Sequence, residues 1–389
     1  MTAATAAAGG PTSATARASV ALRTQFFVLG TLFATWGVHV PTVKAHYGLG
    51  EQALAIAMLA GGVGALAALA QAGRVVGRHG PSAVTAAMGV LCCLAIACLL
   101  AFPFYAALLV VMLVFGVTGS LFDVAINAEA SEIERLAARP LMSGFHGMFS
   151  LGGMAGAGLG SAAPALGLTP QGHLLLATGV AAVAALLASR AMLPVPEHDP
   201  EEKRPLSLPR GPLLLLGVLA AMGLIAEGAM YDWCVLFMKQ ERASSESTAA
   251  LAYASFSGAM AAGRFGGDWV RARMTGTRLM RASGVLAAAG MALALAVPSP
   301  WIALLGFAGV GLGLSNVVPV LFSAASQAPG VSPAHGIAAV SGVGYLGMMA
   351  GPPLIGLVAE HSSLSAGLVV VVVFAMFMAL SAKRAMRAG

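Results

Sequence analysis

Long apolar stretches alternate with short polar segments along almost the whole chain. Each stretch is about 20 residues long, the length at which an α-helix crosses the hydrocarbon core of a bilayer. The strands of a membrane β-barrel would be about ten residues long and would alternate apolar with polar positions, whereas these stretches are continuous and rich in Ala, Leu and Gly. The pattern predicts twelve transmembrane helices with cores near 22–41, 52–72, 82–102, 104–126, 144–166, 172–193, 211–236, 249–267, 279–297, 301–323, 336–358 and 363–382.

Two of the predicted connections are very short and contain proline. Pro103 separates the third stretch from the fourth, and Pro298-Ser299-Pro300 separates the ninth from the tenth. Because proline interrupts helices and favours turns, we expect a tight turn at each of these two places.

Charged residues are scarce, and their positions indicate an orientation. Asp, Glu, Lys and Arg make up 9% of the 389 residues, against about 25% in an ordinary soluble domain, which excludes a soluble enzyme and a disordered chain. Basic residues collect on the cytoplasmic side of membrane proteins. If the N-terminus is cytoplasmic, 18 of the 21 Lys and Arg residues lie on that side, and only Lys44, Lys239 and Arg242 lie outside. The basic pI near 9.5 is therefore a topology signal rather than a sign of nucleic-acid binding.

The longest polar stretch lies close to the middle of the chain. It divides the sequence into a loose cytoplasmic tail at 1–20, a six-helix half at 21–193, a cytoplasmic loop at 194–210 and a second six-helix half with a short tail at 211–389. Motifs that recur 189 or 190 residues apart indicate an internal duplication. Two halves with the same orientation are the parallel-repeat plan of secondary transporters, whose solute site lies between the halves. The recurring motifs are Gly73-Arg74 with Gly263-Arg264, His146-Gly147 with His335-Gly336, and Asn127 with Asn316.

Three acidic residues fall inside the predicted helices, namely Asp123, Glu227 and Asp232. A charge near the bilayer centre costs at least about 2.5–3.5 kcal/mol on insertion scales. With Lys and Arg assigned to the loops, none of the three acids has an evident cationic partner, and a carboxyl group in that setting tends to bind a proton. We expect all three to take part in proton coupling, with Asp123 as the proton carrier. For Asp232, a carboxylate that simply faces water at the membrane surface is the alternative.

Polar and aromatic side chains near these acids are candidates for solute binding. Asp123 and Asn127 are four residues apart, so they share one helix face, and the same spacing joins Glu227 to Tyr231. An amide offers both a donor and an acceptor, and an aromatic ring can stack on the apolar face of a sugar. Structural hydrogen bonds and interfacial anchoring are the alternatives for these residue types. The candidate solute-binding residues are Asn127, Trp36, His39, Tyr231, Trp233 and Asn316.

Glycines recur at every fourth residue in parts of two predicted helices. Gly152, Gly156 and Gly160 lie in the fifth helix, and Gly347 and Gly351 lie in the eleventh. Small residues at this spacing let two helices approach closely. We expect these two helices to lie at the contact between the halves. There the glycines could allow one helix to slide along another, or could simply let the helices pack closely.

Over essentially its whole length the chain resembles the major facilitator superfamily. The segment 73–80, after the second predicted helix, is similar to the signature loop of that family, with Gly77 in place of the usual acid. The segment 263–268, after the eighth predicted helix, is a closer match and keeps the acid. In the family such loops lock one gate through charge pairs. The resemblance therefore implies a gating role for Arg74, Arg78, Arg264 and Asp268.

A finer resemblance is to the fucose-permease-like branch and its uncharacterised bacterial members. The segment 122–127, which contains Asp123 and Asn127, resembles an acid-containing segment that takes part in proton-coupled sugar uptake in that branch. The fucose carrier also has an acid in its first helix, where this chain has His39 and no acid. The resemblance implies proton coupling at Asp123 and a sugar-like solute.

These features together predict an all-helical, multi-pass transporter of a bacterial-type inner membrane. The expected activity is proton-coupled symport of a small polar solute by alternating access, driven by a proton gradient and without another cofactor. Proton-antiporting efflux of drugs or metabolites is the alternative, although Gly156-Ala157 lacks the proline of the usual exporter motif. A membrane sensor or membrane enzyme is a lesser alternative, because the sequence has no metal-ligand spacing, Walker loop or Gly-x-Ser-x-Gly elbow. We expect a monomer in lipid that binds a small solute and no nucleic acid.

Overall fold

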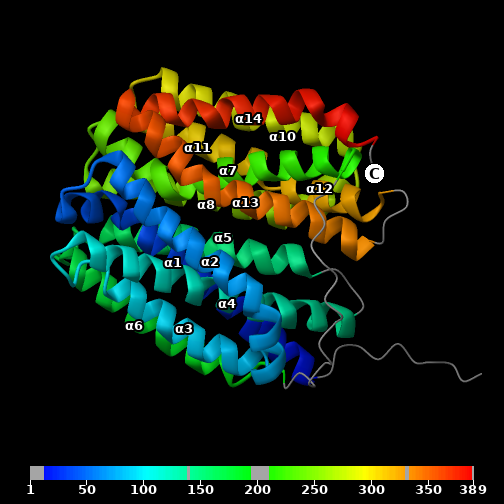
Figure 1. The fold of residues 1–389 in the computed structure, drawn as a ribbon, viewed down its shortest axis with the longest axis horizontal. Coiled ribbons are helices and arrows are strands. Elements are labelled where there is room, and N and C mark those ends of the chain that lie inside the picture. Colours follow the sequence, from blue (N-terminus) through cyan, green and yellow to red (C-terminus); the bar gives the residue numbers. More distant parts are fainter. Residues whose placement is uncertain (1–12, 138–140, 194–209, 329–332, 388–389) are drawn as a thin grey trace, which may run out of the picture.

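Helices form all the regular secondary structure that the computed structural model describes, which covers residues 13–137, 141–193, 210–328 and 333–387. Figure 1 shows two groups of helices side by side, here named the N-terminal bundle and the C-terminal bundle. The N-terminal bundle contains α1 (Ser13–Tyr47), α2 (Glu51–His79), α3 (Pro81–Ala97), α4 (Tyr105–Ala137), α5 (Met142–Ala162) and α6 (Pro170–Ser189). The C-terminal bundle contains α7 (Pro212–Glu241), α8 (Glu246–Phe265), α9 (Gly267–Arg271), α10 (Gly276–Ala296), α11 (Pro300–Leu314), α12 (Val317–Ser326), α13 (Pro333–His361) and α14 (Leu364–Ala385).

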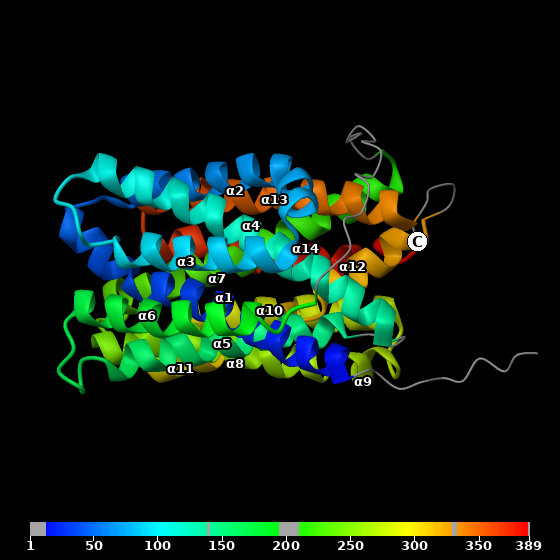
Figure 2. The same ribbon diagram turned by 90° about the horizontal axis from the view of Figure 1, so that it is seen from below.

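The long helices run up and down, so the molecule has two distinct ends (Figures 1 and 2). One end holds the short connections 48–50, 98–104, 163–169, 242–245, 297–299 and 362–363 and is named the hairpin end. The opposite end holds the start of α1, the turn at Gly80 and the close of α14, and is named the tail end. Both described chain termini therefore lie at the tail end.

Every predicted apolar core overlaps a helix of the structure. Within the described ranges, nine helices are long and apolar enough to cross a membrane, and α3 is a shorter apolar helix. The fold class is therefore an all-helical protein with many potential membrane spans. The exact number of twelve crossings and the side of the membrane on which the termini lie stay predictions.

Several predicted boundaries are wrong. The first helix begins at Ser13, so part of the expected loose tail is helical. The third helix ends at Ala97 rather than near residue 102, so the connection around Pro103 spans residues 98–104 instead of one tight turn. The helix α2 continues to His79 through the segment expected to be a loop, because 73–79 contains no strong helix breaker apart from isolated glycines. The predicted tenth helix is two helices, with a break at Ser315 and Asn316.

The regularly spaced glycines lie against helices of their own bundle. A methyl group on Gly152 would overlap the carbonyl of Phe27 in α1, and one on Gly160 would lie 2.8 Å from the Val38 side chain. On α13, Gly347 lies directly against Ala221 of α7. The expectation is confirmed for the helices, because α5 packs against α8 and α13 against α2 across the two bundles. The regularly spaced glycines themselves face within their own bundle, where they fix α5 to α1 and α13 to α7. The remaining two, Gly156 and Gly351, face Thr31 of α1 and Ile225 of α7 in the same way.

Candidate functional site

Asp123 and Asn127 form a hydrogen-bonded pair on one face of α4. The Asn127 amide donates to the Asp123 carboxylate over 3.0 Å and to the Asp123 backbone carbonyl over 2.9 Å. Both side chains are partly exposed, unlike Phe122 and Ile126, which are fully buried on the other side of the helix. Among the ion pairs of the described residues, none includes Asp123. The N-terminal bundle thus presents an acid whose charge no protein cation offsets.

Glu227 has a cationic partner, which corrects the expectation that it lacks one. The Arg264 guanidinium of α8 lies 3.0 Å from the Glu227 carboxylate of α7, and both side chains are largely buried. The same guanidinium donates to the Ser150 hydroxyl of α5 over 2.8 Å. The prediction failed because Lys and Arg were all assigned to the loops, although the predicted helix 249–267 includes Arg264, which lies in the last turn of α8. Arg264 therefore ties two helices of the C-terminal bundle to one helix of the N-terminal bundle.

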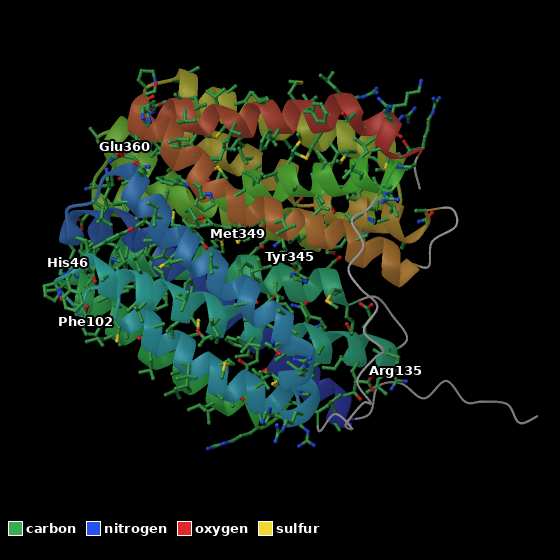
Figure 3. The ribbon with its side chains drawn as sticks, viewed as in Figure 1. His46, Phe102, Arg135, Tyr345, Met349 and Glu360 are labelled. Carbon is green, nitrogen blue, oxygen red and sulfur yellow. The ribbon has the colours of Figure 1, made fainter. Side chains whose placement is uncertain are left out.

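Tyr345 of α13 lies within electrostatic range of both acids, Asp123 of α4 and Glu227 of α7. Tyr345 and Met349 lie along the edge of α13 that faces the N-terminal bundle (Figure 3). The sequence contained no clear signal for Tyr345, because it lies in an apolar, glycine-rich stretch without a neighbouring charge.

The two bundles separate toward the tail end along α2 and α13. A methyl group on Gly62 of α2 would lie 2.9 Å from the Met349 side chain, so the helices touch at this level. One helical turn closer to the tail end, Leu66 is 41% exposed and Tyr345 is 46% exposed. Because these residues lie on the same helix faces as Gly62 and Met349, their exposure shows that the contact does not continue. The face of Tyr345 is therefore open on its tail-end side.

Polar contacts close the hairpin end between the bundles. The Gln240 amide of α7 donates to the Glu51 carboxylate of α2 over 3.0 Å. The Gln52 backbone N–H, in the first turn of α2, donates to the Glu360 carboxylate of α13 over 3.1 Å. Figure 3 shows Glu360 at this end. Polar contacts therefore join the bundles at the hairpin end, and near the tail end α5 still touches α8, where a methyl group on Gly147 would lie 2.6 Å from the Phe265 ring.

Asp232 lies closer to the hairpin end than Glu227, on the same helix. Its carboxylate accepts a long hydrogen bond of 3.4 Å from the Trp36 indole of α1, which again joins the two bundles. Trp36 and Trp233 are both buried, so neither indole offers an open ring face to a solute in this conformation. Tyr231 packs against other rings, 5.1 Å from Tyr253 and 5.0 Å from Phe256 between centroids.

The remaining predicted site residues lie apart from the two acids at mid-helix. His39 of α1 bonds to His173 of α6 near the hairpin end. Asn316 is buried at the break between α11 and α12, where its amide donates to the Gly263 carbonyl over 3.2 Å. Arg74 and Arg78 are exposed in the last turns of α2, and Arg74 donates to Gln71 of the same helix over 2.9 Å. The side chain of Asp268 lies outside the described residues.

The site combines the Asp123 carboxyl group, which is in none of the ion pairs of the described residues, with the ion pair between Glu227 and Arg264. The amide of Asn127 and the hydroxyl of Tyr345 can hydrogen-bond a polar solute, while Asp123 can bind or release a proton next to it. Within the described ranges, no cluster of three or more His, Cys, Asp or Glu side chains could hold a metal ion. The site thus combines an amide, a phenol and a carboxyl group that belongs to none of the ion pairs among the described residues.

Comparison with known proteins gives matches over nearly the whole chain. The profile of the Major Facilitator Superfamily matches residues 23–335. An uncharacterized MFS-type transporter of Yersinia pestis is 36% identical over 369 residues, which cover 95% of this chain and 96% of that protein.

Two solved structures show the same fold at low sequence identity. A D-xylose–proton symporter has a TM-score of 0.73 at 13% identity, covering 94% of this chain and 96% of that one. A bacterial homologue of the human lysosomal transporter Spinster, in an inward-facing and unoccupied conformation, has a TM-score of 0.73 at 15% identity, covering 97% and 98%.

Proposed function

Because this chain belongs to the major facilitator superfamily, we propose that it is a secondary transporter that carries a small polar solute together with protons by alternating access. The solute is bound between the two bundles near the middle of the helices, beside Asn127 and Tyr345. Asp123 carries the proton. The proton gradient supplies the energy, and the protein resides in a bacterial-type inner membrane.

The observation that carries this proposal is the contrast in charge compensation between the two acids. Asp123 has an amide donor but no ion-pair partner among the described residues, whereas Glu227 is paired with Arg264. A charged, uncompensated carboxylate inside a membrane helix is costly. Binding a proton removes that cost, so the proton-loaded form of Asp123 is the one suited to closure of the bundles around the solute.

The class of solute follows from the groups around Asp123. An amide and a phenol offer donors and acceptors of the kind that hydroxyl-rich molecules require. The D-xylose–proton symporter shows that this fold can couple a sugar to protons, and the segment 122–127 resembles the fucose-permease-like branch. A sugar-like solute is therefore our first candidate.

The orientation of the transporter is proposed from the basic residues. Lys and Arg are concentrated on the tail-end side of the chain, and basic residues favour the cytoplasm. With the tail end in the cytoplasm, the polar contacts of Glu51 with Gln240 and of Gln52 with Glu360 lie on the outer side of the membrane. Both chain termini then lie in the cytoplasm, and twelve crossings place them on the same side.

The test compares wild type with Asp123→Asn in proteoliposomes to which candidate radiolabelled sugars are added from outside. A gradient of one pH unit, acidic outside, can raise the internal solute concentration about tenfold when one proton accompanies each solute, since 1.4 kcal/mol corresponds to a factor of ten. We expect Asp123→Asn to lose this accumulation while retaining exchange of labelled for unlabelled solute. Full accumulation by Asp123→Asn would refute its role, and solute leaving vesicles against the gradient would instead identify a proton-antiporting exporter.

A further inference from the structure

Two histidines from different helices of the N-terminal bundle form a buried pair near the hairpin end. His39 Nε2 of α1 lies 2.8 Å from His173 Nδ1 of α6, and the ring centroids are 5.1 Å apart. Their side chains are 8% and 4% exposed. His173 Nε2 is buried without a hydrogen-bond partner among the described residues. The pair therefore has one nitrogen that is ready to exchange a proton once water or another polar group reaches it.

A pocket of about 340 Å³ lies directly against this pair. The N-terminal bundle contributes both histidines, Thr42 and parts of α5 to its lining. The C-terminal bundle contributes Val235 and Lys239 of α7 and the first turns of α8. Because both bundles form its walls, separating the bundles at the hairpin end would widen this pocket.

We propose that His39 and His173 form a second proton-binding site, loaded from the hairpin end when the bundles separate there. This inference rests on the proposed alternation of access but not on the role of Asp123. In a neutral imidazole pair each ring carries one N–H proton, and one of these two protons forms the hydrogen bond between the rings. An added proton would place a positive charge there, which is costly to bury unless it is paired. Opening the hairpin end exposes the pair to water and lowers that cost.

The sign of the pH effect follows from linkage between proton binding and conformation. The conformation that binds more protons is favoured as the pH falls. Since the open hairpin end accommodates the protonated pair and the closed end disfavours it, acid on that side drives the protein toward the open form. The pair thereby provides a way for external acidity to return the transporter to the state that accepts solute and protons from outside.

The charged neighbours act in opposite directions. Lys239 of α7 lines the pocket and repels a protonated pair in the closed state, whereas Glu246 at the exposed start of α8 lines the same pocket and attracts it. Among the described residues, Lys239 and Glu246 belong to none of the ion pairs. Gly160 of α5 and the connection residues Ala163 and Pro164 line the pocket without a titratable side chain.

Two acids of α7 flank the pocket residues along the helix, and both have partners. Asp232 accepts a hydrogen bond from Trp36, one turn from His39 on α1, and Glu241 accepts one from Ser365 at the start of α14.

The test measures opening of the hairpin end as a function of pH with spin labels. Labels attached through Ala165→Cys and Ser362→Cys, in a Cys98→Ala background, report the distance between connections of the two bundles at that end. In this reporter protein we expect the population with the longer distance to grow between pH 8 and pH 5.5. For one linked proton, the ratio of open to closed forms changes at most about tenfold per pH unit. We expect each of the single variants, His39→Gln and His173→Gln, to remove this pH dependence on its own.

The matched control is His46, which lies at the same end but outside the pocket. His46 is exposed, and its ring bonds to the Phe102 carbonyl over 2.9 Å; both residues are labelled at the hairpin end in Figure 3. We expect His46→Gln to keep the full pH response. A response that survives in both pocket variants, or that is absent from the unsubstituted reporter protein, would overturn the proposal. The same measurement with Asp123→Asn distinguishes the two proposals. If this variant loses transport but keeps the pH response of the hairpin end, the histidine pair acts independently of Asp123.

Discussion

The acids of α4 and α7 lie in facing bundles but in opposite electrostatic settings. Asp123 is held by an amide and partly exposed, without an ion-pair partner among the described residues. Glu227 is largely buried and paired with Arg264. Composition alone treats the two as equals, since each is an acid within an apolar stretch. Their surroundings differ: Asp123 has a neutral amide as its partner, whereas Glu227 forms an ion pair with Arg264.

This difference indicates that a change of protonation has different consequences at the two acids. Removing or adding a proton at Asp123 changes the net charge of the space between the bundles, because nothing nearby offsets it. At Glu227 the same change would leave the Arg264 guanidinium unpaired in a largely buried position, which is unfavourable. Under the proposed function, Asp123 is the acid that responds to a proton gradient, and the pairing of Glu227 with Arg264 holds α7 to α8.

The largest effect is expected when the fixed pair is broken. Arg264→Gln leaves Glu227 buried without its cation, and breaking a buried ion pair in this way costs about 3–5 kcal/mol. We expect a clear fall in the thermal unfolding midpoint of the purified protein in detergent.

Two further variants test whether the comparison holds. The double variant Glu227→Gln with Arg264→Gln removes both charges, so we expect it to recover much of the stability that Arg264→Gln loses. Asp123→Asn replaces an uncompensated acid with an isosteric neutral group and is expected to leave the midpoint unchanged or higher. A loss of stability in Asp123→Asn as large as in Arg264→Gln would show that the two acids are not different in kind.

A smaller effect is expected from the neighbour of Asp123. Asn127→Ala removes the amide that holds Asp123 and that is placed to bond the solute. A single hydrogen bond contributes about 1 kcal/mol, which corresponds to about a fivefold change in affinity. We expect the KM for solute exchange to rise by about this factor with little change in the maximal rate. An unchanged KM would show that Asn127 only supports α4 and does not contact the solute.

The smallest effect is expected at an exposed arginine. Arg74 and Arg264 occupy corresponding repeat motifs, yet Arg74 is exposed and bonds only to Gln71 of its own helix. Surface substitutions of this kind usually change stability by less than about 0.5 kcal/mol. We therefore expect Arg74→Gln to unfold at the temperature of the wild type. Reduced transport at unchanged stability would indicate that Arg74 pairs with another group only in a different conformation.

The sequence predicts the helices and the position of Asp123 well because both depend on local pattern. Hydrophobic stretches of membrane length produce helices whatever their neighbours are, and the four-residue spacing alone places Asn127 beside Asp123. The pairing of Glu227 with Arg264 depends on a basic residue at a helix end. Arg264 was assigned to the loop side of the eighth helix, whereas it lies in the last turn of α8 and bonds to Glu227 of α7 and Ser150 of α5.

Contacts between distant segments are the part that local pattern does not contain. His39 and His173 are 134 residues apart and come together only because α1 packs against α6. Tyr345 gains its importance from Asp123 and Glu227 on two other helices. Trp36 and Trp233 show the opposite case, since their residue type suggested a sugar-stacking role and their burial removes them from the open face.

The break at Ser315 and Asn316 has a consequence for how motion spreads through the C-terminal bundle. The Asn316 amide is bonded to the carbonyl of Gly263, the residue immediately before Arg264. A helix interrupted at one point opens there more readily than along its continuous turns, so local opening of this joint also releases the last turn of α8. We therefore expect faster amide hydrogen exchange around residues 315–317 when the ion pair between Arg264 and Glu227 is broken.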